Sequence, residues 1–388
     1  MVTLPVMLYG LRCNFLHVPL IFLLPQIFDA EDVRRIGRWV LIGTVPMAIL
    51  MVYQFRAPQD AWINRTVGAG EGFQLASAMG KIRPPGTFSF ITGVVSYFAM
   101  ATAFLSYGMA GRSIYPRWLL IASTVGIALA LSVSGSRSTV LESAIVLATF
   151  ALGMVRARQM AAGLSRLLIL VVIALFILGY TQHFDEGKEV LGARFAEASN
   201  TEKEGGGLAQ RFFNQFTGPI RILFDVPIFG QGVGVGTNVG AKLMTGEMQF
   251  LVSEGEWGRL VGELGPLLGV AMIWFRLSLA LWMGQLCYRM VSRGNILPLM
   301  LFSCSALNVV SGQWGQSTTL GFSVLGAALA LTAAKHADEA AIAQVLSSAP
   351  PINQISAKPK RTMYPAGAYG GRKPKAPVES DDDEDIFK

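Results

Sequence analysis

Charged residues are scarce in this sequence. Only 15% of its 388 residues are charged, whereas 52% are hydrophobic, and a soluble globular domain usually carries about 25% charged residues. The scarcity is greater over residues 1–334, because residues 335–388 hold much of the charge. Residues 1–334 are too apolar to be solvated as one soluble core, and this excludes an ordinary soluble globular protein.

Cysteine and histidine are also few, and neither forms a cluster. The cysteines lie at or near the ends of apolar stretches and make no C-x-x-C pair, so we interpret them as small, buried apolar residues. The histidines are far apart in sequence, and no H-E-x-x-H or related spacing occurs. We therefore predict neither a metal site nor a cofactor. These residues are Cys13, Cys287, Cys304, His17, His183 and His336.

Basic patches interleaved with aromatic residues, which are typical of RNA-binding proteins, do not occur. The net charge of +7 therefore needs another source. Membrane proteins gather Lys and Arg in their cytoplasmic loops, and this alone raises the isoelectric point. We predict the lipid bilayer as a partner, and no nucleic acid.

Long apolar stretches take the place of charge. A transmembrane helix needs about 20 mostly apolar residues to cross a hydrocarbon core about 30 Å thick. We predict an all-α, polytopic membrane helix bundle of about nine spans, in which a transmembrane domain (1–334) with a large external loop (181–263) precedes a disordered tail (335–388). The predicted spans are 12–28, 37–55, 89–109, 117–134, 139–155, 164–180, 264–286, 295–313 and 317–334.

The short loops between these spans indicate the orientation. Arginines gather in the loops that follow spans one, three, five and seven, and all these loops fall on one face. Short loops rich in Lys and Arg lie in the cytoplasm, so we predict a cytoplasmic C-terminus and an external N-terminus. No secretory signal precedes the first span. One explanation for an external N-terminus is that the chain is a truncated version of a longer protein with further spans before Met1.

The segment 335–388 is rich in Pro, Lys and Asp and ends in a run of acidic residues. Such a segment cannot bury enough apolar area to offset its ordering entropy. We interpret it as a solvated cytoplasmic tail, with a docking site for a cytoplasmic partner as the alternative.

Five arginines lie in the predicted external loops or at the adjoining ends of spans. Guanidinium groups bind phosphate bidentately and stay charged near a membrane, so these residues suit the diphosphate head of a lipid. The alternative is that each one snorkels to lipid headgroups and has no catalytic role. The five are Arg83, Arg137, Arg211, Arg221 and Arg259.

The large loop holds a glycine-rich run and a group of carboxylates. The run, G-Q-G-V-G-V-G at 230–236, lacks the strand, helix and βαβ context of a dinucleotide site, so it is either a substrate-facing turn or a tight loop. Glu254 and Glu256 are candidate general bases. In a helix, Glu256, Arg259 and Glu263 would share one face, and an ion-paired helix start is the alternative interpretation.

These motifs occur in a characteristic order. An R-x-x-G-T-F element precedes one span, and an S-G-S-R-S turn lies at the outer end of another. The large loop then holds an Arg, an apolar-Pro-apolar-Phe-Gly-x-Gly turn and an acidic-Arg-acidic-Leu-Gly run. The ordered set covers about residues 10–334 and resembles the O-antigen ligase and O-antigen polymerase superfamily of bacterial inner-membrane proteins. The matching segments are 10–22, Asp32, 53–55, 83–88, 134–138, Arg211, 227–232 and 256–265.

The resemblance implies metal-independent transfer or polymerisation of glycan from an undecaprenyl-diphosphate-linked donor at the periplasmic face, in contact with other polysaccharide assembly proteins. Its diphosphate-binding arginines correspond to Arg83, Arg137, Arg211 and, less directly, Arg221. Family ligases also place a His in the large loop as base, but the matching stretch here, 253–257, has none. Either Glu254 or Glu256 replaces that base, or the chemistry differs, or activity is absent.

Two other functions fit the sequence. Glu142 and Arg276 lie within predicted spans, and ionisable residues at mid-membrane are typical of transporters, so a transporter or flippase of a lipid-linked or anionic substrate is one alternative. A non-catalytic subunit of a polysaccharide assembly complex is the other. Most of the charge in the membrane domain lies at the outer rim instead, which favours the enzyme.

Overall fold

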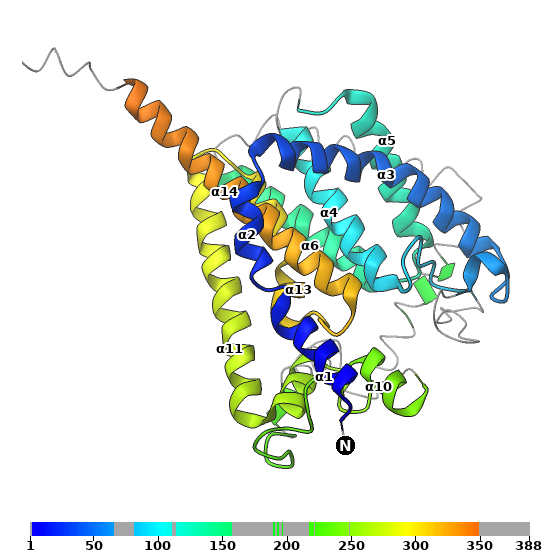
Figure 1. The fold of residues 1–388 in the computed structure, drawn as a ribbon. Helices are drawn as coiled ribbons and strands as arrows, with labels where there is room; N and C mark the ends of the chain where they lie inside the picture. Colours follow the sequence, from blue (N-terminus) through cyan, green and yellow to red (C-terminus); the bar gives the residue numbers. More distant parts are fainter. Residues whose placement is uncertain are drawn as a thin grey trace, which may run out of the picture. The chain divides into compact units, whose positions relative to one another are not determined.

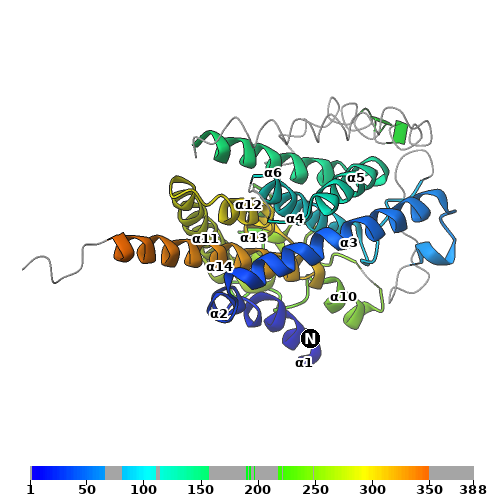
Figure 2. The ribbon, with the colours of Figure 1, turned by 90° about the horizontal axis from the view of Figure 1, so that it is seen from above.

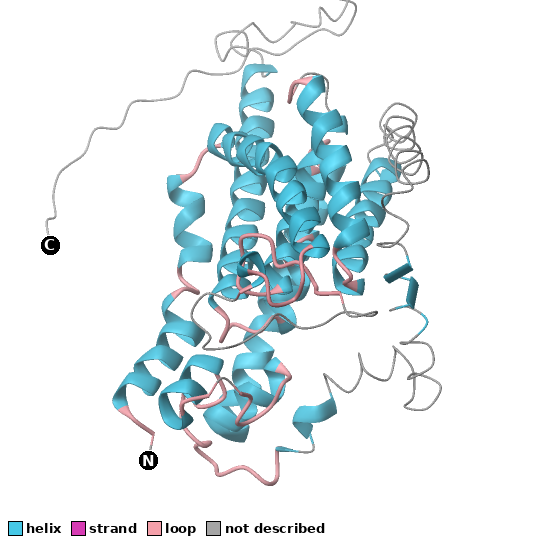
Figure 3. Cartoon of the chain, turned by 90° about the vertical axis from the view of Figure 1, so that its right-hand side faces the viewer, coloured by secondary structure: helices cyan, strands magenta, loops and turns pink. Residues whose placement is uncertain are grey.

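The computed structural model describes residues 2–65, 81–110, 114–156, 189–190, 192–193, 196, 217–220, 222–247 and 249–348. Within these ranges the regular elements are all helices, with no strand among them (Figures 1 and 3). The all-α prediction is confirmed for this part of the chain. Arg211, Arg221 and His183 lie outside the described residues.

Several helices have the character of membrane spans. Five are long and apolar enough to cross a membrane by length and composition, and a bent pair (Leu4–Leu16 with Leu20–Ile27, 52° apart) brings the number to six if it counts as one span. The predicted multi-span membrane architecture is therefore supported, whereas the count of nine is not confirmed. The five helices are α3 (Ala30–Arg56), α4 (Ile91–Ala110), α6 (Arg137–Arg156), α11 (Glu256–Ser292) and the first part of α14 (Ser317–Ser348).

Three of the predicted spans account for the difference. Residues 117–134 form α5 (Arg117–Val133), an apolar helix that is shorter than the other spans. Residues 164–180 lie outside the described residues. The predicted span over 295–313 is not confirmed, because this stretch forms two short helices, α12 (Leu297–Ser303) and α13 (Ala306–Ser311), instead of one continuous helix.

Two side-chain hydrogen bonds and a close helix contact lie at the break between α12 and α13. The Cys304 thiol and the Ser305 hydroxyl each donate to the carbonyl oxygen of Leu301, both at 3.1 Å. Bonds of this kind compete with the helical pattern. Gly326 of α14 also packs here so closely that a Cβ on it would lie 2.6 Å from the Ser305 Cβ. The apolar composition of this stretch does not predict such a break.

The helix α3 begins at a capping box. The Asp29 carboxylate accepts a hydrogen bond from the Asp32 backbone N–H, and the Asp32 carboxylate accepts one from the Asp29 backbone N–H. Further along, α3 packs against α5 and α4, and α4 packs against α6 (Figure 2). The Tyr97 hydroxyl of α4 donates to the Val40 carbonyl of α3 at 2.7 Å. Such interhelical hydrogen bonds help to hold helices together in lipid.

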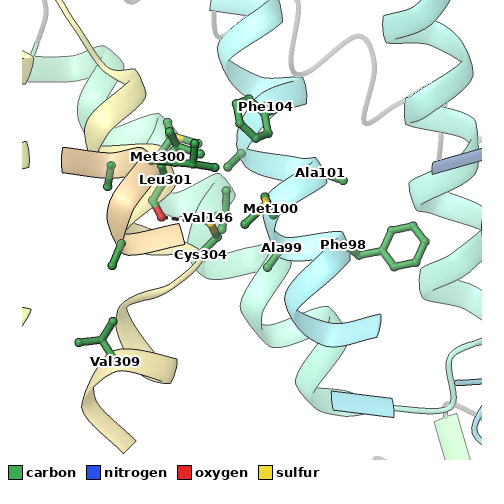
Figure 4. Packing of buried hydrophobic residues seen from close by; sticks show 14 of the residues in the cluster. Phe98, Ala99, Met100, Ala101, Phe104, Val146, Met300, Leu301, Cys304 and Val309 are labelled. Atoms are coloured by element: carbon green, nitrogen blue, oxygen red, sulfur yellow. Dashed lines mark hydrogen bonds between the residues drawn. The ribbon is translucent and has the colours of Figure 1, made fainter. Parts of the chain in front are cut away.

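One part of the core lies where α4, α6 and α12 meet (Figure 4). Small residues of α4, Ala99, Ala101 and Ala103, are fully buried and let the neighbouring helices approach closely. Larger side chains fill the remaining space. They are Met100, Val146, Met300 and Leu301. Phe104 packs instead against Gly37 of α3, and Phe98 points away from α12 (Figure 4).

The glycine-rich run at 230–236 forms a tight loop between the start of α11 and the N-terminal helix. Its backbone N–H groups at Gln231 and Gly232 donate to α11 carbonyls at 2.8 and 3.2 Å, next to a break in α11 at Gly265, where φ is +82°. On its other side, the run touches α1 (Leu4–Leu11). A Cβ on Gly10 would lie 2.4 Å from the Gly234 nitrogen. A short helix, α10 (Asn238–Thr245), follows the run.

At one end of the bundle, the contacts join segments that the span order predicts to share a face. The Tyr115 hydroxyl donates to the Arg34 carbonyl at 3.3 Å, and a His336 ring nitrogen lies 3.3 Å from the Phe28 carbonyl. The chain divides into two compact units, Met1–Ala343 and Gln344–Lys388. The helix α14 continues past the predicted domain boundary at 334, and residues 349–388 lie outside the described residues. The disordered tail, like the side of the membrane on which it lies, therefore stays a prediction.

Candidate functional site

A cavity of about 480 Å³ opens among the first turns of α4 and α6, the helix α13 and the start of α14. Ile91, Val95, Leu141 and Leu307 form its apolar part. Its polar part combines one cation, one carboxylic acid and a series of hydroxyl and amide groups. The polar lining residues are Arg83, Thr92, Ser96, Ser136, Ser138, Glu142, Asn308, Ser311, Gln313 and Thr319.

Arg83 is held at the cavity by the segment that leads into α4. The buried Gln54 side chain, near the end of α3, makes two hydrogen bonds to this segment at Gly86. Its Nε2 donates to the Gly86 carbonyl at 2.9 Å, and its Oε1 accepts from the Gly86 N–H at 2.8 Å. Gly86 has φ of +62°, a conformation that L-residues with a side chain rarely adopt. This clamp fixes the loop that carries Arg83.

The S-G-S-R-S turn forms another part of the cavity wall. Gly135 has φ of +54°, and the Ser134 hydroxyl donates to the Leu131 carbonyl at 3.0 Å while it accepts from the Ser136 N–H at 3.3 Å. The turn places Ser136 and Ser138 in the cavity lining. Arg137 lies between them as the first residue of α6 and is half-buried.

Glu142 follows one turn further along α6 and lines the same cavity. Its Oε2 atom is buried and has no hydrogen-bond partner among the described residues. The neighbouring hydroxyls of Thr139 and Ser143 are also buried and have no hydrogen-bond partner among the described residues. Sequence reasoning used Glu142 only in support of transport and missed it as a companion of Arg83. Its position four residues after Ser138, on one face of a helix, was the available signal.

Amide side chains connect the remaining walls. Asn308 of α13 donates through Nδ2 to the Ser96 hydroxyl of α4 at 3.0 Å. Gln313 donates through Nε2 to the Glu254 carbonyl and accepts a hydrogen bond from Gln316. The cavity is therefore built from elements that are far apart in sequence but joined by neutral hydrogen bonds.

A buried ionic network lies at the start of α11. The Glu256 carboxylate contacts Arg259 at 2.8 Å and Arg276 at 2.7 Å, and Arg259 contacts Glu263 at 2.7 Å. Their side chains are only 0–4% exposed. Asn14 accepts from the Arg259 Nη2 at 2.8 Å and so joins the N-terminal helices to the network. Two arginines balance two glutamates, and their mutual attraction and hydrogen bonds offset the desolvation cost of burying these charges.

This network also supports the cavity wall. The Arg276 guanidinium donates to the carbonyls of Asn308, Val309 and Gly312, at the C-terminal end of α13. It also lies 3.9 Å from the centre of the Trp314 ring. A cation at a helix C-terminus satisfies carbonyls that lack a helical partner. Arg276 thus fixes α13 and the turn after it, which carry Asn308 and Gln313 to the cavity.

The structure separates the predicted site residues into two groups. Arg83 lines the cavity, and Arg137 does not, although its neighbours Ser136 and Ser138 do. Arg259 and Glu256 belong to the buried network. The geometry at Glu256 matches the ion-paired helix start. The Glu254 side chain is exposed. The catalytic roles of Glu254 and Glu256 stay predictions, as do the roles of Arg211 and Arg221.

No group of three or more His, Cys, Asp or Glu residues suited to a metal ion occurs among the described residues. Comparison of the chain with protein-family models, with curated proteins and with solved structures found no match.

Proposed function

We propose that this chain is a multi-pass membrane protein that binds an undecaprenyl-diphosphate-linked glycan in the cavity and transfers the glycan to an acceptor. The observation that carries the proposal is that Arg83 and the S-G-S-R-S turn, far apart in sequence, border one cavity. The resemblance to the O-antigen ligase and polymerase superfamily supports it, because both motifs belong to the matching set.

The chemistry of the cavity suits a donor with an anionic head and an apolar tail. Arg83 can bind phosphate oxygens bidentately and stays charged beside a membrane. Leu141 lines the cavity and is 59% exposed on α6, so an apolar chain can leave the site towards lipid at this point. The volume of about 480 Å³ lies within the range of about 300–1,000 Å³ that ligand sites usually have.

The finer placement belongs to the same proposal. The cavity faces the periplasm of a bacterial inner membrane, the full chain has about nine spans, and the C-terminus lies in the cytoplasm. The order of the predicted spans and the arginine-rich short loops support this orientation. Other polysaccharide assembly proteins then supply the lipid-linked donor and take the product.

Binding of undecaprenyl diphosphate to the purified full-length protein tests the proposal. Arg83→Gln is expected to weaken binding about tenfold or more, since a hydrogen bond to a charged group contributes about 1.5–3 kcal/mol. Arg56→Gln is the matched control, because Arg56 is exposed at the end of α3 that carries Gln54. Equal binding by wild type and Arg83→Gln would contradict the proposed site.

Transport is the second candidate, and Glu142 is the observation that favours it. This acid lies in the candidate span α6, where ionisable residues often mark an ion or substrate pathway. Movement of a lipid-linked donor across the membrane of proteoliposomes that contain the protein, without consumption of the donor, would favour transport over glycan transfer as the function.

A further inference from the structure

We propose that Glu142 is the group that accepts the proton of the acceptor hydroxyl, and that the amides beside it hold the acceptor sugar. This inference rests on the proposed function, because it assigns a residue to the same cavity. It differs from the sequence prediction, which placed the base at Glu254 or Glu256.

The position of Glu142 in the cavity supports this assignment. Glu142 lines the cavity together with Arg83, so an acid and a cation face one space of about 480 Å³. Ser138 and Glu142 are four residues apart in α6, which places both on the same face of the helix. A donor whose diphosphate lies at Arg83 therefore has a carboxylic acid within the same cavity.

Glu142 is also available to a bound ligand, whereas the buried glutamates of α11 are not. The buried glutamates of α11 are occupied by the protein itself: Glu256 contacts two arginines, and Glu263 contacts Arg259 and accepts from the Gly236 N–H at 2.9 Å. Glu142, in contrast, takes part in no ion pair among the described residues, and its Oε2 has no hydrogen-bond partner there. A buried polar group without a partner costs free energy and is usually explained by function or by an absent ligand.

The other polar groups that line the cavity suit a sugar. Asn308, Gln313, Ser96 and Ser311 are neutral and offer both donors and acceptors. Such groups match the hydroxyls of a sugar better than a second anion. The Asn308 side chain is already oriented by its bond to Ser96, and its backbone carbonyl is held by Arg276. The acceptor site is thus formed before the sugar arrives.

The step balances as follows. The acceptor hydroxyl oxygen forms a bond to the anomeric carbon of the donor sugar as its proton passes to the Glu142 carboxylate. The bond between that carbon and the diphosphate oxygen breaks, and its electron pair leaves with undecaprenyl diphosphate. Arg83 stabilises the negative charge on the leaving group. The proton then passes from Glu142 to solvent or to the departing diphosphate, and no oxidant, reductant or metal takes part in this step.

Two measurements on full-length variants test the assignment. The first is binding of undecaprenyl diphosphate to purified protein. The second is polysaccharide product, together with accumulated lipid-linked donor, in cells of a null strain that carry each variant. We expect Glu142→Gln to bind like wild type but to lose about 10²–10⁴-fold in product formation, the usual contribution of a general base. Glu31→Gln, which changes an exposed acid of α3, is the control and should match wild type in both.

Each outcome decides between the possibilities. Wild-type product formation by Glu142→Gln overturns the role of Glu142 and leaves the proposed function intact. Absence of both binding and product in wild type overturns the proposed function itself. If Glu142→Gln fails to accumulate in the membrane, Glu142→Asp takes its place, because a displaced carboxylate must also slow the transfer. Wild-type product from that variant, or parallel loss of binding and product, would show that Glu142 is not the base.

Discussion

Replacement of Glu256 by Gln removes a negative charge that Arg259 and Arg276 share. The carboxylate accepts two hydrogen bonds from Arg259, both at 2.8 Å, one from Arg276 at 2.7 Å and one from the Trp314 N–H at 3.2 Å. Gln keeps the volume but leaves one net positive charge in a site where Glu256 and both arginines are nearly inaccessible to solvent. Loss of one partner of a buried ion pair costs about 3–5 kcal/mol, and we expect a loss of stability of about this size.

Thermal or denaturant unfolding of the purified protein in detergent or nanodiscs measures this loss. Glu31→Gln is the matched control, because Glu31 pairs with Arg34 at 3.8 Å and both side chains are more than half exposed. An exposed pair of this kind contributes about 0–1 kcal/mol. A Glu256→Gln loss no larger than that of Glu31→Gln would refute the buried network.

The same variant separates two interpretations of Glu256. If Glu256 is the catalytic base, Glu256→Gln abolishes product while the folded protein keeps its stability. If Glu256 holds the arginines in place, stability falls, and product falls with the amount of folded protein. A second variant, Arg276→Gln, should then resemble Glu256→Gln, because Arg276 connects the network to α13.

Two further predictions concern stability. Gly234→Ala should destabilise the protein by about 1–3 kcal/mol, the usual cost of overpacking. The reason is that a Cβ at this position, where φ is +93°, would lie 2.2 Å from the Val6 carbonyl oxygen. Gly218 has open space around it, so Gly218→Ala should have little effect in the same unfolding assay. The Asp32 backbone N–H, by donating to the Asp29 carboxylate, lowers the pKa of Asp29 below its usual value. A lowered folded-state pKa contributes stability above the unfolded value, about 3.9, that is lost as pH falls through the folded pKa, so Asp29→Ala should lower the unfolding midpoint near neutral pH and converge with wild type in strong acid.

The outcome along the chain shows which features apolar length can predict. The spans predicted at 37–55, 89–109 and 139–155 correspond to α3, α4 and α6, because each is a continuous apolar helix. The helix α11 starts at Glu256 but breaks at Gly265, where φ is +82°, so the predicted span start at 264 coincides with the break between its two parts. Its first turns carry charges that lower hydropathy, yet these charges neutralise each other inside the protein. Hydropathy counts each charge separately, and it therefore identifies the apolar part of α11 after the break and leaves out the charged turns before it.

Spacing along a helix explains the part of the network that the sequence predicted. Glu256, Arg259 and Glu263 are three and four residues apart, and the structure forms both pairs. Arg276 joins the same network from the part of α11 beyond the break at Gly265, and Asn14 joins it from the N-terminal segment. These partners depend on how helices pack, which the spacing within one helix does not determine.

The cavity follows the same division between local and tertiary information. Arg83 and the S-G-S-R-S turn were placed at one membrane face by the alternation of spans, and both border the cavity. Asn308 and Gln313 reach it only because the chain turns between α12 and α13 and Arg276 binds the carbonyls that follow. A site assembled this way joins a cation fixed by its own loop to amides positioned by a distant ion pair. A substitution in the network can therefore displace the amide groups of Asn308 and Gln313 while Arg83, held by Gln54, keeps its place.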